Sequence, residues 1–428
     1  MFALCVGVPA NAQTGVAEVD SAAAARGAYS RASAALRAND LPKARTEMTR
    51  AATAWPSQPA YVWGRAVVSA RAADTAGTLA ALTDYAALGL GRDIAEGAVA
   101  PFRDLPAFAA VRARLDSNRA PRVRSTVRAQ LPDSTFWPEG MDYDARTQTI
   151  YVASVRHRTV AAHSANGATR ELWARSQPTV GAMMGVRVDA KRNVLWATTS
   201  GLKQMNGYAP ADSSIAALLR IDVATGAITR RWDLPAVQGG HVLGDLAVGP
   251  NGDVYVTDSS EPVLYRLRPG VDTLERLTHP LFRSLQGMAP TPDGRTLYVA
   301  DYSHGLLRVD LATRTVTRVA DAPHSTSLGC DGIAWHNGAI IAVQNGVAPA
   351  RIVRFVLDPS GTRIVRDEVL DQNIPLAGAP TIGAVVGDRF VYVANSQWDE
   401  YDDDGRRLPK TTLSAPRLLS VPLGKSLP

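Results

Sequence analysis

The sequence predicts an all-β six-bladed β-propeller that is preceded by a small all-α region. Short apolar segments ending in Ser, Asn or Asp recur after residue 125, at spacings of about 43 to 59 residues, which is the range of propeller blades. Residues 18–117, in contrast, are rich in alanine and have helical spacing. The change falls at 118–125, NRAPRVRS, which we interpret as a linker.

The first residues, MFALCVGVPANAQT, resemble the end of a secretory signal peptide. An apolar run is followed by the A-x-A pattern of Ala10 and Ala12, which predicts cleavage before Gln13. Cleavage there would remove Cys5 and leave Cys330 as the one cysteine, without a disulfide partner. We therefore expect a periplasmic or secreted protein.

The helical region 18–117 carries a weak internal repeat. A first helical segment ends near Asp40, and LPKARTEMTRAATAW restarts after it with Pro42 in the first turn. An offset of 34 residues aligns Asp40 with Asp74, and 34 is the period of a tetratricopeptide helix pair. Two alanine-rich hairpins of any kind would also match in this way. We predict a tetratricopeptide-like arm that leans on the next domain and offers a surface for a protein partner.

The strand-rich body, residues 126–428, divides into six units. Their central strands are IYVAS (150–154), VLWATTS (194–200), VYVTDSS (254–260), LYVADYS (297–303), IIAVQNG (340–346) and VYVANSQ (391–397). TVRAQLP (126–132) resembles the outer strands of these units but has no unit before it, and the last unit ends at RLLSVPL (417–423) without an outer strand. The first strand is therefore expected to complete the last blade and close the ring.

Composition excludes some classes of function. The 428 residues carry a formal charge of +6. The arginines are scattered without a dense basic block, so we expect no nucleic-acid partner. After the first residues, no apolar stretch reaches the length of a membrane helix, so no transmembrane segment is expected. A small molecule bound in the propeller channel is the remaining expectation.

The innermost strand of each blade starts near the channel mouth, so residues far apart in sequence can converge there. Alignment of the units places these pairs at equivalent positions: Glu139-Gly140, Met184-Gly185, Gly244-Asp245, Gln286-Gly287, Asp331-Gly332 and Ile382-Gly383. Carboxylate and carboxamide oxygens without clustered His or Cys suit a hard cation such as calcium or magnesium. The alternative is a set of polar strand ends that cap turns or bind water.

Four of these segments carry a family resemblance. WPEGMDYDARTQTIYVAS, LGDLAVGPNGDVYVTDS, QGMAPTPDGRTLYVADYS and CDGIAWHNGAIIAV resemble the blade-opening motifs of the regucalcin/gluconolactonase/luciferin-regenerating-enzyme family. The resemblance covers residues 126–423 and leaves the helical region out. It implies a six-bladed propeller with one divalent cation in its channel, calcium in the first place, and a lactone-hydrolase activity.

The resemblance also implies roles for single residues. Glu139 and Asp331 match two metal ligands, and Asp331 matches the base of lactone hydrolysis. Gln286 stands where the family has an asparagine ligand, and its carbonyl oxygen can still bind a metal. Gly244 stands where the family has the asparagine that contacts substrate, although Asp245 follows it as a second candidate catalytic residue. This departure puts catalysis, and above all a sugar-lactone substrate, in doubt.

Three further residues are candidates for substrate binding: Trp137, Tyr302 and His304. The two aromatic residues favour an apolar or ring-shaped ligand, or pack between blades, and His304 is either an acid–base group or a hydrogen-bonded loop residue. The acidic segment 398–407 resembles a calcium loop in part, but it lacks the carboxylate at the twelfth position. We interpret it as a solvated loop.

These observations lead to one functional hypothesis and one alternative. The hypothesis is an exported, metal-dependent hydrolase of a lactone or related ester, with Glu139, Gln286 and Asp331 as metal ligands and Asp331 and Asp245 moving protons. The alternative is a binding propeller without catalysis, with the helices as an interaction arm.

Overall fold

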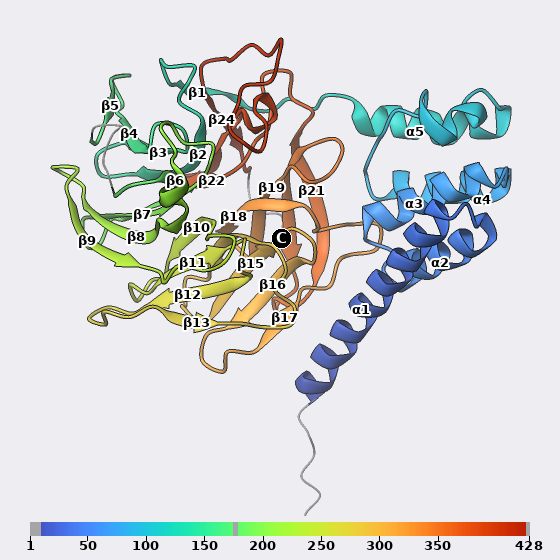
Figure 1. Ribbon diagram of the computed structural model, residues 1–428, viewed down its shortest axis with the longest axis horizontal. Helices are drawn as coiled ribbons and strands as arrows, with labels where there is room; N and C mark the ends of the chain where they lie inside the picture. The colour runs from blue at the N-terminus through green and yellow to red at the C-terminus, as the bar shows by residue number, and fades with distance from the viewer. Residues whose placement is uncertain (1–9, 174–178, 425–428) are drawn as a thin grey trace, which may run out of the picture.

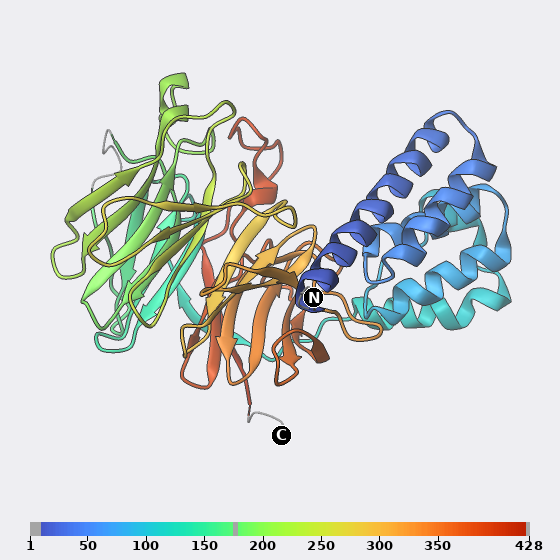
Figure 2. The ribbon, with the colours of Figure 1, turned by 90° about the horizontal axis from the view of Figure 1, so that it is seen from below.

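The computed structural model describes residues 10–173 and 179–424, which form a helical region beside a β-propeller (Figures 1 and 2). The predicted signal-peptide remnant, residues 1–13, lies mostly outside the described residues. The helical region contains α1 (Ala10–Arg37), α2 (Leu41–Ala54), α3 (Pro59–Arg71), α4 (Thr75–Ala87), η1 (Gly97–Phe102), η2 (Pro106–Phe108) and α5 (Ala109–Arg119). Within the described part of the chain, none of the helices combines the length and apolarity that crossing a membrane requires.

Two aspartates start equivalent helices. Asp40 accepts a hydrogen bond from the Lys43 backbone N–H at the start of α2, and Asp74 accepts one from the Gly77 N–H at the start of α4. Such caps satisfy backbone donors that have no partner inside the helix. The caps lie at the offset of 34 residues on which the repeat was aligned. The tetratricopeptide-like assignment itself stays a prediction.

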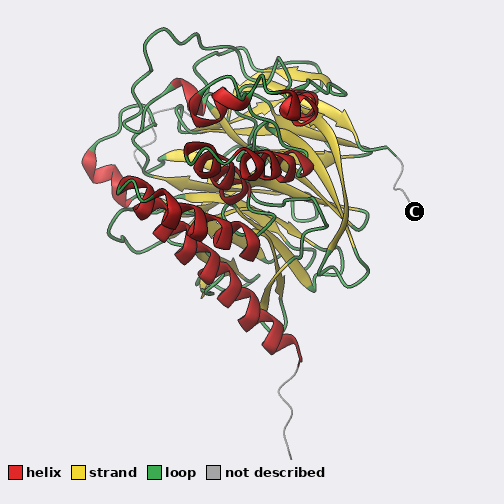
Figure 3. Ribbon diagram, turned by 90° about the vertical axis from the view of Figure 1, so that its right-hand side faces the viewer, coloured by secondary structure: helices red, strands yellow, loops and turns green. Residues whose placement is uncertain are grey.

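The helices pack against one side of the propeller, as Figure 3 shows in the view onto them. Val347 of the propeller packs against the apolar core of α3, α4 and α5, and Leu328 packs in the cluster of α1, α2 and α3. The Gly91 N–H donates to the Ala348 carbonyl at 3.0 Å, and Arg122 exchanges two backbone hydrogen bonds with Gln372 at 3.0 Å. The helical region therefore shares part of its core and its backbone pairing with the propeller.

The propeller has six antiparallel sheets of four strands each, which confirms the predicted fold class. From inner to outer strand they are β2 (Pro138–Asp144), β3 (Thr149–Ser154), β4 (Thr159–His163) and β5 (Thr169–Glu171); β6 (Ala182–Asp189), β7 (Val194–Ser200), β8 (Ala216–Asp222) and β9 (Ile228–Asp233); β10 (Leu243–Val248), β11 (Val254–Asp258), β12 (Val263–Leu267) and β13 (Glu275–Leu277); β14 (Leu285–Pro290), β15 (Thr296–Asp301), β16 (Gly305–Asp310) and β17 (Val316–Arg318); β18 (Cys330–His336), β19 (Ala339–Gln344), β20 (Arg351–Leu357) and β21 (Ile364–Gln372); and β22 (Gly383–Val386), β23 (Arg389–Val393), β24 (Arg417–Pro422) and β1 (Thr126–Gln130).

The ring closes through the first strand of the body. β1 pairs antiparallel with β24, with Thr126 opposite Ser420 and Gln130 opposite Arg417. The expected completion of the last blade by the first strand is confirmed. This pairing joins the two ends of the propeller sequence and satisfies backbone groups that an open edge would leave free.

Polar residues at the ends of central strands accept hydrogen bonds from the backbone near the start of inner strands. Asp301 at the end of β15 accepts hydrogen bonds from the backbone N–H groups of Arg283 and Ser284, just before the inner strand β14. Ser200 at the end of β7 accepts one from the Leu243 N–H at the start of β10. The recurring Ser, Asn or Asp thus fixes the loops that lead into the inner strands, and so the channel mouth.

Candidate active site in the propeller channel

The inner strands β2, β6, β10, β14, β18 and β22 contact one another around the channel. Glycines allow their close approach. A Cβ added to Gly140 would lie 2.2 Å from the Met184 carbonyl oxygen, and one added to Gly287 would lie 2.7 Å from that of Asp331. Any larger residue would push neighbouring strands apart. The residues before these glycines, among them Glu139 and Gln286, are thereby drawn toward a common axis.

The same positions carry irregular strand pairing. The register of five inner strands shifts between Pro138 and Met141, Met183 and Val186, Leu243 and Asp245, Leu285 and Met288, and Cys330 and Ile333. A β-bulge interrupts strict alternation and re-aims a side chain. The candidate ligands Glu139, Gln286 and Asp331 all lie inside these irregular stretches. The sequence alignment did not show this feature.

The charge of Asp331 acts on the carboxyl group of Glu139. Glu139 is buried, whereas Asp331 is half-buried. Burial and the nearby Asp331 raise the pKa of Glu139 to about 8. Burial and the charge of Asp245 raise the pKa of Asp331 to about 7. The charge of Asp331 is one cause of the raised pKa of Glu139, so these two predicted ligands share one electrostatic environment.

Each of the two carboxylates is held by one neutral donor. The Trp398 indole N–H donates to Glu139 Oε2 at 2.7 Å, and the Asn345 amide donates to Asp331 Oδ2 at 2.8 Å. The other oxygens, Glu139 Oε1 and Asp331 Oδ1, have no hydrogen bond to any described residue. Neither oxygen is one of the fully buried atoms that lack a partner, so both are accessible to water or to a ligand.

Gln286 lies beside the empty position of Gly244. A Cβ added to Gly244 would come within 3.8 Å of the Gln286 side-chain oxygen. The Gln286 amide makes one long contact of 3.4 Å with the Ser284 hydroxyl. Its carbonyl oxygen therefore faces space that a side chain at position 244 would partly fill.

Asp245 differs from the other carboxylates because it has a cationic partner. Arg187 Nη2 lies 3.0 Å from Asp245 Oδ2, and the same guanidinium donates to the Met141 and Val186 carbonyls. Burial raises the pKa of Asp245, and Arg187 opposes that rise. Arg187 also lines a second cavity of about 390 Å³ between the later parts of the inner strands. Asp245 thus contributes to the electrostatic potential at Asp331, but its carboxylate is already paired with Arg187.

An aromatic cluster covers the Glu139 side. Trp137 is buried, stacks on Tyr401 with ring centres 4.2 Å apart, and meets the edge of Trp398 at 4.9 Å. Trp398 begins η4 (Trp398–Glu400), in the long connection between β23 and β24. The interpretation of 398–407 as a solvated loop is therefore wrong for Trp398 and Tyr401, because these two rings pack over Trp137 while the acidic residues after them face outward.

The two remaining substrate-binding candidates lie in different places. The Tyr302 hydroxyl donates to Asn345 Oδ1 at 3.0 Å and thus reaches the residue that holds Asp331. Burial and Asp331 raise the pKa of Tyr302 to about 12. His304 instead contacts the helical region, with its Nε2 2.6 Å from Arg26 and its ring 5.5 Å from Trp55. The prediction that His304 binds substrate in the channel is corrected by this position.

Sequence reasoning missed Asn345, Tyr401 and Arg187. Asn345 follows the strand motif in IIAVQNG, and its place after a central strand was a usable signal. Tyr401 and Arg187 gave none, because a long loop and a mid-strand arginine carry no pattern that points inward. Three-dimensional packing alone places them at the site.

The oxygen donors of the channel bear on metal binding. Among the described residues, no group of three or more His, Cys, Asp or Glu side chains is arranged to hold a metal ion. The channel set has two carboxylates and one carboxamide, all oxygen donors, and the free oxygens of Glu139 and Asp331 lack donors of their own. This chemistry fits a hard divalent cation.

The comparison with protein families matches this part of the chain. Residues 137–369 match the model of the SMP-30/Gluconolactonase/LRE-like region. The chain belongs to this family. The match starts at the Trp137-Pro138-Glu139 segment and includes Gly244, Gln286 and Asp331, so the candidate ligands lie within the family region, whereas Trp398 and Tyr401 lie beyond it.

Solved structures of similar fold include a gluconolactonase from Xanthomonas campestris, with 18% identity over 71% of this chain and 94% of that one and a TM-score of 0.44. A calcium-binding regucalcin from Agrobacterium tumefaciens has 17% identity over 69% and 93%, with a TM-score of 0.47. A virginiamycin B lyase from Staphylococcus aureus has 15% identity over 63% and 81%, with a TM-score of 0.45. None of the curated proteins compared with the chain matches it.

Proposed function

We propose that the protein is a metal-dependent hydrolase of a lactone or related ester that acts in the propeller channel. The observation that supports this proposal most directly is the arrangement of Glu139 and Asp331. Both carboxylates have a raised pKa, accept one hydrogen bond from a neutral donor, and have a second oxygen without a hydrogen bond to any described residue. Membership of the gluconolactonase-like family supports the reaction class.

Glu139, Asp331 and Gln286 would hold the cation, and calcium is the first candidate because all three offer oxygen. Bound there, the cation would supply a Lewis acid that polarises the ester carbonyl. A cation would also offset the repulsion between the two carboxylates, which the described residues do not neutralise.

Asp331 is the better base of the two candidate catalytic aspartates. It has no cationic partner among the described residues, and Asn345 holds its Oδ2 and thereby fixes the rotamer, so the carboxylate can accept a proton from an attacking water. Asp245 has its Oδ2 on Arg187 and its Oδ1 on the Leu246 N–H. We therefore assign Asp245 an electrostatic role and Asp331 the proton transfer.

The surroundings favour an apolar substrate. Gly244 offers no side chain to clamp a polyol, and Trp137, Trp398 and Tyr401 add aromatic surface on the Glu139 side. We infer a preference for aliphatic or aromatic lactones over aldonolactones. The segment 1–13 adds the proposal that the enzyme works after export, in the periplasm or outside the cell.

A binding propeller without turnover is the second candidate. The hydrogen bond from Trp398 to Glu139 favours it, because that contact occupies one oxygen of the site and lays a ring beside it. In this reading the cation would stabilise the fold or a ligand without catalysing a reaction.

The test combines metal binding with turnover. Calcium should raise the melting temperature of the wild type, and Glu139→Gln should remove most of that rise. With calcium present, Asp331→Asn should lower kcat/KM on an aromatic lactone about a hundredfold or more. Asp403→Asn, which removes an exposed carboxylate from the nearby loop, is the matched control and should leave both readouts unchanged.

The outcomes separate the candidates. A calcium-dependent rise in melting temperature without turnover of any lactone or ester in a broad panel would favour the binding propeller. A melting temperature that ignores calcium and magnesium would show that Glu139 and Asp331 hold no such cation.

A further inference from the structure

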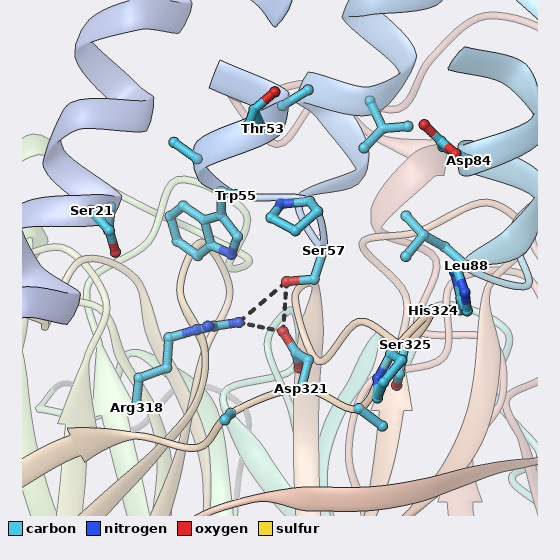
Figure 4. A pocket seen from close by; sticks show the side chains of 18 of the residues that line it. Ser21, Thr53, Trp55, Ser57, Asp84, Leu88, Arg318, Asp321, His324 and Ser325 are labelled. Atoms are coloured by element: carbon cyan, nitrogen blue, oxygen red, sulfur yellow. Dashed lines mark hydrogen bonds and ion pairs between the residues drawn. The ribbon is translucent and has the colours of Figure 1, made fainter. Parts of the chain in front are cut away.

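A cavity of about 740 Å³ lies between the helices and the propeller. Figure 4 shows Asp321, which follows β17, with Ser57 of the helical region and Arg318 beside it. Asp321 also accepts hydrogen bonds from the hydroxyl and the backbone N–H of Ser327, at 2.6 and 3.0 Å, so its carboxylate is saturated with donors. The channel carboxylates are held differently, by a few neutral groups that lie around the last blade.

Thr381, just before the innermost strand β22 of the last blade, lies between the segments of the two carboxylate ligands. Its hydroxyl donates to the Glu139 carbonyl at 3.1 Å, and its own carbonyl accepts a hydrogen bond from the N–H of Gly332, the residue after Asp331, at 3.3 Å. A Cβ added to Gly332 would lie 2.9 Å from the Thr381 carbonyl oxygen, so this approach requires glycine. Thr381 is only 2% exposed. One buried residue thus contacts the chain at both ligands, which belong to the two neighbouring blades.

The threonine contact falls where strand pairing is interrupted. The register of β2 against β3 shifts around Glu139, so the ladder places no paired residue opposite it, and the Thr381 hydroxyl donates to its backbone instead. Gln286 repeats the arrangement. It lies where the register of β14 shifts, and its carbonyl accepts a hydrogen bond from the hydroxyl of Thr257, in the preceding blade, at 2.9 Å. A threonine hydroxyl therefore fixes the backbone at two of the irregular ligand positions.

The side chain of Asp331 is tied to the same segment through Asn345. The Asn345 amide nitrogen donates to Asp331 Oδ2 and to the carbonyl of Pro380, the residue before Thr381, each at 2.8 Å. The Tyr302 hydroxyl donates to Asn345 Oδ1 at 3.0 Å. Both neighbours of the amide nitrogen are acceptors, so the amide has one orientation, and the tyrosine holds it there.

We propose that Thr381 and Asn345 are positioning residues that set the separation of the two channel carboxylates. Two like charges do not hold each other in place, so their spacing has to come from the surrounding chain. Thr381 fixes the backbone at Glu139, Asn345 fixes the carboxylate of Asp331, and both contacts belong to the Pro380-Thr381 segment. This positioning role rests on the proposed function, in which the two carboxylates share a cation.

The first measurement is the calcium affinity of the full-length protein by isothermal titration calorimetry. Thr381→Val keeps the shape of the side chain but removes the hydroxyl, and it should weaken calcium binding about tenfold, as loss of a partner behind a metal ligand typically does. Thr381→Ser keeps the hydroxyl and should bind within about twofold of the wild type. Asn345→Leu removes both amide contacts and should weaken binding about tenfold or more.

Two matched controls lose similar contacts away from the channel. The buried Thr78 hydroxyl donates to the Asp74 carbonyl at 2.7 Å, so Thr78→Val removes a comparable bond. Asn118 donates to two backbone carbonyls of the helical region at 2.8 Å, so Asn118→Leu matches Asn345→Leu. Both controls should lower the melting temperature and leave the calcium affinity of the folded protein unchanged.

The second measurement needs no metal. Crystal structures of the metal-free wild type and variants give the separation of the carboxyl carbons of Glu139 and Asp331. It should change by about 0.5 Å or more in Thr381→Val and in Asn345→Leu, because binding sites have to be held within about that tolerance. In Thr381→Ser the separation should stay as in the wild type.

An unchanged separation in both Thr381→Val and Asn345→Leu would overturn the inference and leave the proposed metal site standing. Equal losses of calcium affinity in the two controls would also overturn it, because the effect would then reflect general stability. A wild type that binds neither calcium nor magnesium would overturn the proposed function instead, and the metal-free structures would still decide whether Thr381 and Asn345 position the carboxylates.

Discussion

The propeller holds Glu139 and Asp331 on one side and Asp301 on the other in contrasting surroundings, although Glu139 and Asp301 are both buried and Asp331 is half-buried. Asp301 accepts four backbone N–H groups, at 2.7 to 3.1 Å, and its pKa is lowered because these bonds and the His304 side chain outweigh burial. Glu139 and Asp331 have one neutral donor each, and their pKa values are raised. A carboxylate that holds the fold is saturated with donors, and one that is meant for a ligand is not.

A buried histidine lies next to Asp301. Arg26 can only donate to His304 Nε2, so neutral His304 carries its proton on Nδ1, 3.6 Å from Asp301 Oδ1. This Nδ1 has no hydrogen-bond partner among the described residues, so His304 is only partly satisfied. It fixes the helical region on the propeller and leaves the channel to the carboxylates.

The largest expected effect on stability comes from replacing an aspartate by asparagine in each of the two surroundings. Asp301→Asn should lower the free energy of unfolding by about 3 kcal/mol, because its new amide group faces N–H donors. Asp331→Asn should leave it within about 1 kcal/mol of the wild type or raise it, because a repulsive charge is removed. Urea denaturation in the presence of a chelator measures both. Equal losses in the two variants would break the comparison.

The second prediction concerns pH in metal-free protein. The folded state raises the pKa of Glu139 from its ordinary 4.5 to about 8, so it binds more protons than the unfolded state across this interval. Its contribution to stability is full below pH 4.5 and is lost as the pH rises through about 8. The melting temperature should therefore fall over this range, and Glu139→Gln should flatten the fall. Asp301 has the opposite sign, since its pKa is lowered, and its contribution is lost only in acid.

A melting temperature that stays level from pH 5 to 8 in chelator would contradict this reading of the channel pair. Addition of calcium supplies the internal control, because a bound cation favours the charged carboxylates and should reduce the slope.

The smallest expected effect concerns the indole N–H of Trp398. Trp398→Phe keeps a ring but removes the N–H that lowers the pKa of Glu139, so the alkaline loss of stability should move to higher pH. The free energy of unfolding should change by only about 1 kcal/mol at neutral pH. Tyr401→Phe, which keeps the stacked ring and has no bond to Glu139, is the control. An unchanged pH profile in Trp398→Phe would mean that the indole does not control Glu139.

The candidate ligands could be selected from the sequence because each precedes a glycine in a repeated unit. Glu139-Gly140, Gln286-Gly287 and Asp331-Gly332 recur with the blades, and a closed ring of blades forces equivalent positions to meet. His304 was misplaced for the converse reason. Its loop also lies at the end of a central strand, but packing of Trp55 and Arg26 from the helices turns it into an interface.

The sequence alone determined the propeller, its closing strand and the residues that can offer oxygen to the channel. It could do so because blade periodicity and strand alternation are local properties that the chain repeats. Only the tertiary structure decided which carboxylates remain without donors, that Trp398 and Tyr401 cover the Glu139 side, and that the helices enclose a cavity with the propeller. These features depend on contacts between residues hundreds of positions apart, such as Trp398 with Glu139 and Ser57 with Asp321. No local pattern encodes such pairs, because burial and hydrogen-bond partners are set by packing.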